Sequence, residues 1–149
     1  MKNIPIGQIL VENGFLKEEQ LNEALEKQRT EPGKKLGDVL LELGYVSETQ
    51  LAQALSIRLK VPFIDLTTTK IDIEAVKKIP EAIAKKNCCV AFQMTDSRLT
   101  VATDDPINFY IFEELKVISG MEIHAMIATR TAINETINKA YSQQTVSNV

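Results

Sequence analysis

The stretch that decides the fold is written twice. Residues 5–28 read PIGQILVENGFLKEEQLNEALEKQ, and residues 35–58 read KLGDVLLELGYVSETQLAQALSIR. When the first is shifted by thirty residues onto the second, nine of the twenty-four positions are identical, and most of the others are conservative pairs such as Phe15/Tyr45. A match of this length at a fixed spacing indicates an internal duplication.

Each copy predicts a short helix, a glycine turn and a longer helix. In the second copy Leu36, Leu40 and Leu43 fall at helical spacing, and Gly44 stands where a helix end needs a left-handed residue. The sequence Ser47-Glu48-Thr49-Gln50 then has the capping-box pattern that begins a new helix.

The first copy repeats this pattern around Gly14, with Lys17 in place of the capping serine. One helical hairpin does not bury its own apolar face, so the two copies are expected to pack on each other. We expect an approximate two-fold between them, with Gly7 and Gly37 on one surface.

The periodicity changes after Lys60. Strands are predicted at 88–94, 98–103 and 121–128, with an edge strand at 61–66 in which Pro62 has no N–H to donate. Helices are predicted at 71–86, broken at Pro80, and at 107–119 and 131–141. The expected fold class is α+β: a duplicated helical-hairpin subdomain (5–60), an α/β subdomain with a three-stranded, mostly antiparallel sheet (61–141), and a polar tail (142–149).

Composition excludes several classes. The chain has 149 residues, 44% of them hydrophobic and 25% charged, which is typical of globular domains. The net charge of −3 disfavours general nucleic-acid binding, and Glu18, Glu19 and Glu23 would repel DNA phosphates from the second helix of copy one. No apolar run is long enough to span a bilayer, and the first residues lack a signal-peptide pattern, so we expect a cytoplasmic protein without direct membrane insertion.

The sequence offers no catalytic or metal constellation. Cys88 and Cys89 are expected to be reduced core thiols, and His124 a half-buried structural histidine. Asp104-Asp105 is expected to cap a helix rather than to bind metal. No Walker A loop is found, because Gly33-Lys34 is followed by a lysine rather than Ser or Thr. We therefore expect no enzyme activity and no obligatory cofactor.

The doubled unit, followed by Pro62-Phe63-Ile64-Asp65-Leu66, resembles the N-terminal MshEN-type domain of type II secretion and type IV pilus assembly ATPases. The resemblance extends from residue 5 to about residue 141 and implies a module that docks a hexameric motor to inner-membrane platform proteins. The motor and its tetracysteine zinc site are absent from these residues, so we expect an N-terminal fragment or a free-standing module. Any association with the inner membrane would then run through partners.

The resemblance also implies a possible ligand, because a subset of the family binds cyclic di-GMP on the doubled motif, one half of the nucleotide on each copy. Free N–H groups at a glycine-led helix start suit a phosphate, and leucines suit a guanine face. The residues to which the resemblance assigns this ligand are Gly7, Leu10, Leu21, Leu25, Gln28, Lys35, Leu36, Gly37, Leu40, Leu51, Leu55 and Arg58.

This sequence departs from the binding pattern at its polar positions. The opening Arg or Asn is replaced by Pro5 and Lys35, and the closing Gln is kept as Gln28 but is Arg58 in copy two. Arg29, Lys34 and Lys35 could compensate for the lost groups by charge. The leucines and glycines would be needed for packing and turns in any case, whereas Gln28, Lys35 and Arg58 have no evident structural role. The alternative interpretation is therefore a pure docking domain that has lost nucleotide binding.

Overall fold

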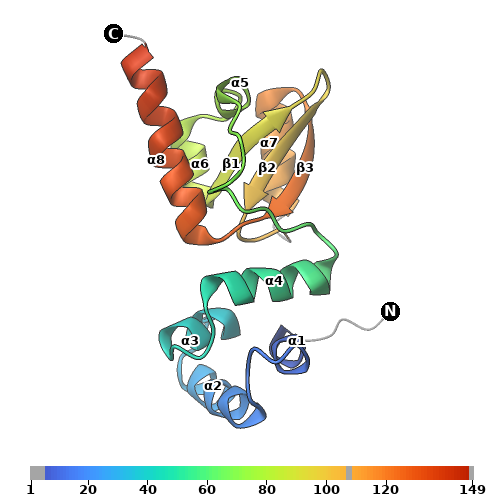
Figure 1. Ribbon diagram of the computed structural model, residues 1–149, viewed down its shortest axis with the longest axis vertical. Helices are drawn as coiled ribbons and strands as arrows, with labels where there is room; N and C mark the ends of the chain where they lie inside the picture. The colour runs from blue at the N-terminus through green and yellow to red at the C-terminus, as the bar shows by residue number, and fades with distance from the viewer. Residues whose placement is uncertain (1–5, 107–108, 148–149) are drawn as a thin grey trace. The chain divides into compact units, whose positions relative to one another are not determined.

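The doubled sequence folds into four helices, α1 (Ile6–Glu12), α2 (Glu18–Thr30), α3 (Leu36–Glu42) and α4 (Glu48–Leu59). The computed structural model describes residues 6–106 and 109–147 and divides into two units, Met1–Lys60 (unit 1) and Val61–Val149 (unit 2) (Figure 1).

The two copies in unit 1 make the same turns. Gly14 and Gly44 have φ values of 78° and 74°, the left-handed conformation expected at both positions. The Phe15 N–H donates to the Leu10 carbonyl at 2.9 Å, and the equivalent bond from Tyr45 to Leu40 is 3.1 Å. The thirty-residue repeat of the sequence is therefore a thirty-residue repeat of backbone geometry.

The starts of α2 and α4 differ as the sequence predicts. Ser47 accepts a hydrogen bond from the Gln50 N–H at 3.1 Å, and the Gln50 side chain accepts one from the Ser47 N–H at 3.0 Å, which completes a capping box. In copy one only the reciprocal half is present, because Gln20 accepts from the Lys17 N–H but a lysine side chain has no acceptor.

Unit 2 is a three-stranded sheet with helices around it. The strands are β1 (Cys89–Met94), β2 (Arg98–Thr103) and β3 (Glu122–Ile127), in the order β1-β2-β3. The helices are α5 (Ile73–Val76), α6 (Glu81–Asn87), α7 (Phe109–Ser119) and α8 (Arg130–Ser147). In Figure 1, α7 lies behind the sheet, while α5, α6 and α8 gather on the β1 side.

The α+β class and the three strands are confirmed, but the sheet is mixed rather than mostly antiparallel. β1 and β2 form the expected antiparallel hairpin, with a bulge between Ala91 and Gln93. β2 and β3 are parallel, because α7 carries the chain back to the starting end of the sheet before β3 begins.

The predicted edge strand at 61–66 is reduced to a single bridge between Phe63 and Ile127. Two hydrogen bonds of 2.8 Å make this bridge, one from the Ile127 N–H to the Pro62 carbonyl and one from the Ile64 N–H to the Ile127 carbonyl. Pairing stops there because Asp65 turns the chain, its carboxylate accepting from the backbone N–H and the hydroxyl of Thr67.

The helix boundaries in unit 2 follow the sequence with two corrections. Pro80 separates α5 from α6, as predicted. Cys88 does not start a strand but ends α6 in a left-handed conformation (φ 49°). α8 does not stop at Tyr141 but continues through Ser147, because residues 142–147 contain no Gly or Pro to end it. The expected start of α7 at Ile107 lies outside the described residues.

The core of unit 2 is closed by one buried tyrosine. The Tyr141 hydroxyl, on α8, donates to the Ile79 carbonyl at 2.6 Å and so ties α8 to the link between α5 and α6. Phe92, Leu99 and Ile133 are fully buried around the sheet. In the described ranges, no helix is long and apolar enough to cross a membrane.

Candidate functional site

The doubled motif is assembled by exchange between the two copies. α1 packs against α4, and α2 packs against α3, so that the first helix of each copy rests mainly on the second helix of the other. This is the reciprocal packing that an approximate two-fold axis between the copies produces.

The glycines that open α1 and α3 allow close contact within each copy. A Cβ atom placed on Gly7 would lie 2.6 Å from Leu21 Cδ1, and one placed on Gly37 would lie 3.1 Å from Leu51 Cδ2. The same Cβ on Gly7 would lie 3.3 Å from Leu36 Cδ2, so the residue before Gly37 is close to the start of copy one. The openings of the two copies are therefore neighbours.

The motif leucines divide by burial. Leu10 and Leu40 are fully buried and hold the core of unit 1 together. Leu25 is 39% exposed, and the other four are partly buried, namely Leu21, Leu36, Leu51 and Leu55. Only the exposed and partly buried leucines present apolar surface to a ligand in this conformation.

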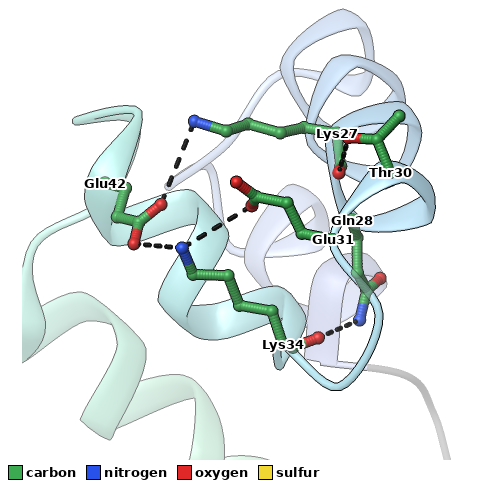
Figure 2. Close-up of polar contacts among 6 residues, drawn as sticks. All are labelled: Lys27, Gln28, Thr30, Glu31, Lys34 and Glu42. Carbon is green, nitrogen blue, oxygen red and sulfur yellow. Dashed lines mark hydrogen bonds and ion pairs between the residues drawn. The ribbon is translucent and has the colours of Figure 1, made fainter.

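The closing residue of copy one has a structural partner that the sequence does not reveal. The Gln28 side-chain amide donates to the Lys34 carbonyl at 3.0 Å, which ties the end of α2 to the loop that leads into α3 (Figure 2). Gln28 therefore lies at the opening of copy two.

Arg58, the counterpart of Gln28, is half-buried near the end of α4, the helix that packs on α1. Its Nε is buried and has no hydrogen-bond partner among the described residues. Gln28 is bonded to the Lys34 carbonyl, and the repeat counterpart of Lys34 is Ile4. Ile4 lies outside the described part of the chain, so the equivalent bond of Arg58 is not described.

The opening polar positions are unequal. Lys35 is exposed and precedes α3, where its carbonyl accepts from the Val39 N–H at 3.2 Å. Pro5, its counterpart, lies outside the described residues. Among the described residues, a basic side chain therefore lies beside the opening of copy two, at Lys35.

Four charged side chains join the end of α2, the inter-copy loop and α3 (Figure 2). The Lys34 ammonium forms a short ion pair with Glu42 and lies 3.6 Å from a Glu31 carboxylate oxygen. Lys27 approaches the other Glu42 oxygen at 3.9 Å. Hydrogen bonding between Lys34 and Glu42 raises the pKa of the lysine and lowers the pKa of Glu42. Sequence reasoning missed this cluster, although residues 27–42 contain three lysines and three acidic residues.

In the described ranges of unit 2, no group of three or more metal-ligating side chains comes together. Burial, then the nearby Asp104 carboxylate, raises the pKa of both Cys88 and Cys89 to about 12. Asp104 accepts from Arg130 Nε at 2.9 Å. The prediction for His124 is wrong, since this side chain is exposed rather than half-buried, because it lies on the same face of β3 as the exposed Glu122.

Known proteins share this architecture. The MshEN domain model matches residues 59–147, which is more than half of the chain. The chain belongs to the MshEN family. The doubled motif lies before the matched residues, but the structural comparisons extend over it.

A structure of MshE with cyclic di-GMP superposes on this MshEN chain with a TM-score of 0.79 and 32% sequence identity, covering 93% of this chain and 99% of that one. The N-terminal domain of XpsE has the same fold, with a TM-score of 0.69 at 22% identity, covering 93% of this chain and 97% of that one.

The type IV pilus assembly ATPase PilB of Myxococcus xanthus (strain DK1622) is 29% identical over 139 residues. That match covers 93% of this chain but 24% of PilB, so this chain spans about a quarter of the length of that relative.

Proposed function

We propose that this MshEN module binds cyclic di-GMP through its doubled motif and acts as a non-catalytic regulatory adaptor for a secretion or pilus ATPase. The similarity to MshE supports cyclic di-GMP as the ligand, because a structure of MshE has been solved with cyclic di-GMP and is 32% identical in sequence to this chain. The similarity to PilB supports the motor as the partner.

The single observation that carries the proposal is the proximity of Gly7 to Leu36, whose Cδ2 would lie 3.3 Å from a Cβ atom placed on Gly7. One dinucleotide can bridge two half-sites only where the openings of the two copies are adjacent, and this proximity supports that arrangement. Had the two glycines been on opposite sides of unit 1, a single ligand could not have reached both.

Each half-site combines the opening of one copy with the closing residue of the other. In one, the Gln28 amide is bonded to the Lys34 carbonyl, next to Lys35 and the start of α3. In the other, the α1 helix that carries Gly7 packs on α4, which ends near Arg58. A guanidinium whose buried Nε–H has no acceptor among the described residues suits a guanine or phosphate oxygen, because a ligand acceptor would restore the missing hydrogen bond.

Isothermal titration calorimetry of the purified chain with cyclic di-GMP tests the proposal. We expect saturable heat in the micromolar range, whereas a flat titration up to millimolar ligand would refute it. Arg58→Ala should weaken binding roughly ten- to a hundredfold, as the loss of a charged contact of about 1.5–3 kcal/mol implies. Arg98→Ala is the matched control, since Arg98 is an exposed arginine on β2 of unit 2, outside the doubled motif.

Pro5→Arg tests the family pattern at the poorer half-site. If position 5 points toward the ligand as the resemblance implies, the new guanidinium should tighten binding of cyclic di-GMP. Unchanged or weaker affinity in the same titration would show that copy one serves for packing at this position.

A second function, docking to an inner-membrane platform protein, is favoured by one feature of unit 2. Tyr110 and Val117, seven residues apart on α7, are 90% and 82% exposed. Large apolar side chains with such exposure on one helix are common at protein interfaces. Tyr110→Ser and Val117→Ser together should reduce binding of a platform protein in a pull-down of purified components and leave the cyclic di-GMP titration unchanged. Retention of full binding would remove α7 from the interface.

A further inference from the structure

Lys34 precedes the doubled motif's second opening and has no counterpart in copy one. The residues thirty positions earlier are Ile4 and Pro5, where copy two has Lys34 and Lys35. Position 27 is likewise a lysine whose counterpart is Ile57. These three lysines thus have no basic counterpart in the other copy, although the helices and glycines are duplicated.

The Lys34 main chain is already part of that half-site. Its carbonyl accepts the Gln28 amide at 3.0 Å, and the next residue, Lys35, leads directly into α3 and Gly37. The side chain, in contrast, runs along α3 toward its far end, where Glu42 and Glu31 take up the ammonium (Figure 2).

The ion pairs that hold the ammonium there are partly open to water. The side-chain exposures are 30% for Lys34, 39% for Glu31 and 45% for Glu42. Ion pairs at such sites contribute little net free energy, because water and salt screen them. A phosphate can therefore replace a carboxylate as the partner of Lys34 at small cost.

We propose that Lys34 is a further binding residue for a phosphate of the ligand. While no ligand is bound, Glu42 and Glu31 hold the Lys34 ammonium away from the ligand site. This inference rests on the proposed function of unit 1. On binding, rotation of the flexible lysine side chain moves the ammonium from the carboxylates to the α3 opening, where Lys35 and Gly37 lie. Lysine suits this role, because its ammonium is a point charge without a fixed fork and can exchange one anion for another.

The proposal predicts opposite changes in ligand affinity when the two partners of this ion pair are substituted. Removing the lysine removes a ligand contact, whereas neutralising the acid releases the lysine to the ligand. A purely structural ion pair would respond in the same direction to both changes.

The test is calorimetric titration of cyclic di-GMP into the wild-type chain and three variants. Lys34→Gln should weaken binding about two- to fivefold, and Glu42→Gln should tighten it by a similar factor, the range for partly exposed charge pairs. Glu12→Gln is the matched control, because Glu12 is the repeat counterpart of Glu42 and no described lysine is paired with it, and its affinity should equal that of the wild type. Circular dichroism checks that each variant is folded.

The outcomes separate this inference from the proposed function. If the wild type binds and Lys34→Gln binds equally well, or Glu42→Gln weakens binding as Lys34→Gln does, the inference is wrong while the function stands. If the wild type shows no heat with cyclic di-GMP, both are refuted. Should Glu42→Gln not fold, Glu31→Gln carries the same expectation, because it removes the other carboxylate beside Lys34.

Discussion

The strongest structural prediction compares two substitutions that the duplication makes equivalent in sequence, Gly7→Ala and Gly37→Ala. At Gly7 the added methyl group would lie 2.6 Å from Leu21 Cδ1 and 3.3 Å from Leu36 Cδ2, so it meets side chains from two other helices. At Gly37 the three nearest atoms all belong to Leu51, at 3.1–3.7 Å. Neither glycine has a positive φ, so steric contact rather than backbone strain decides the effect.

The expected magnitudes follow from two opposing effects. Alanine stabilises a helix by about 0.8–1 kcal/mol relative to glycine, while overpacking a core costs about 1–3 kcal/mol. At Gly37 Leu51 needs to give by only a few tenths of an ångström, so the two effects nearly cancel. At Gly7 the overlap is larger and Leu36 limits the escape of Leu21, so we expect a net loss of about 1–2 kcal/mol in the free energy of unfolding.

Hydrogen–deuterium exchange of peptides from α1–α4, measured in increasing urea, reports the stability of unit 1 separately from unit 2. The Gly7 variant should open at lower urea than the wild type, and the Gly37 variant close to it. If Gly37→Ala costs as much as Gly7→Ala, or more, the reasoning from these contacts is wrong.

The remaining predictions concern capping, pH and thiol chemistry. Ser47→Ala should destabilise unit 1 by about 0.5–2 kcal/mol, and Lys17→Ser should stabilise it by completing the missing half of the first capping box, both measured by urea unfolding. Hydrogen bonding to Lys34 lowers the pKa of Glu42 below 4.5. The contribution of the ionised Glu42 to the free energy of unfolding is therefore present above that pH and is lost as the pH falls through the lowered pKa. Unfolding of unit 1 between about pH 6 and about pH 3 should therefore depend less on pH in Glu42→Gln than in the wild type; identical curves would contradict this. The pKa of Cys88 and of Cys89 is raised from 9.0 to about 12, so the thiolate fraction falls about a thousandfold, and alkylation by iodoacetamide should be slow until the chain is unfolded. Fast labelling of Cys89 in the folded chain would show that this thiol is not buried as described.

Much of the fold could be predicted because the signals are local. The left-handed Gly14 and Gly44, the Ser47 capping box and the break at Pro80 depend on a few neighbouring residues. Strand direction is different, because it depends on how α7 connects β2 to β3, and residue spacing alone does not specify that. The end of α8 was missed because residues 142–147 are polar but contain nothing that stops a helix.

The candidate site was harder to predict, because it depends on contacts between residues that are distant in the sequence. Spacing identified the residues at equivalent positions, but not that Leu10 and Leu40 are fully buried or that Gln28 is bonded to the Lys34 carbonyl. Those facts depend on contacts between the copies. The Lys34–Glu42 pair joins residues that are eight apart, on a loop and at the far end of α3, a spacing that no helical pattern highlights.

The most direct test of the central claim is a titration of the ¹⁵N-labelled chain with cyclic di-GMP, followed by amide ¹H–¹⁵N chemical shifts. If one dinucleotide bridges both copies, the amides of Gly7 and Gly37 should shift together and saturate at the same ligand concentration, with Leu36 among the largest changes and the strands of unit 2 unaffected. Shifts at Gly37 without shifts at Gly7, shifts confined to unit 2, or a spectrum unchanged at millimolar ligand would contradict a bridged site on the doubled motif.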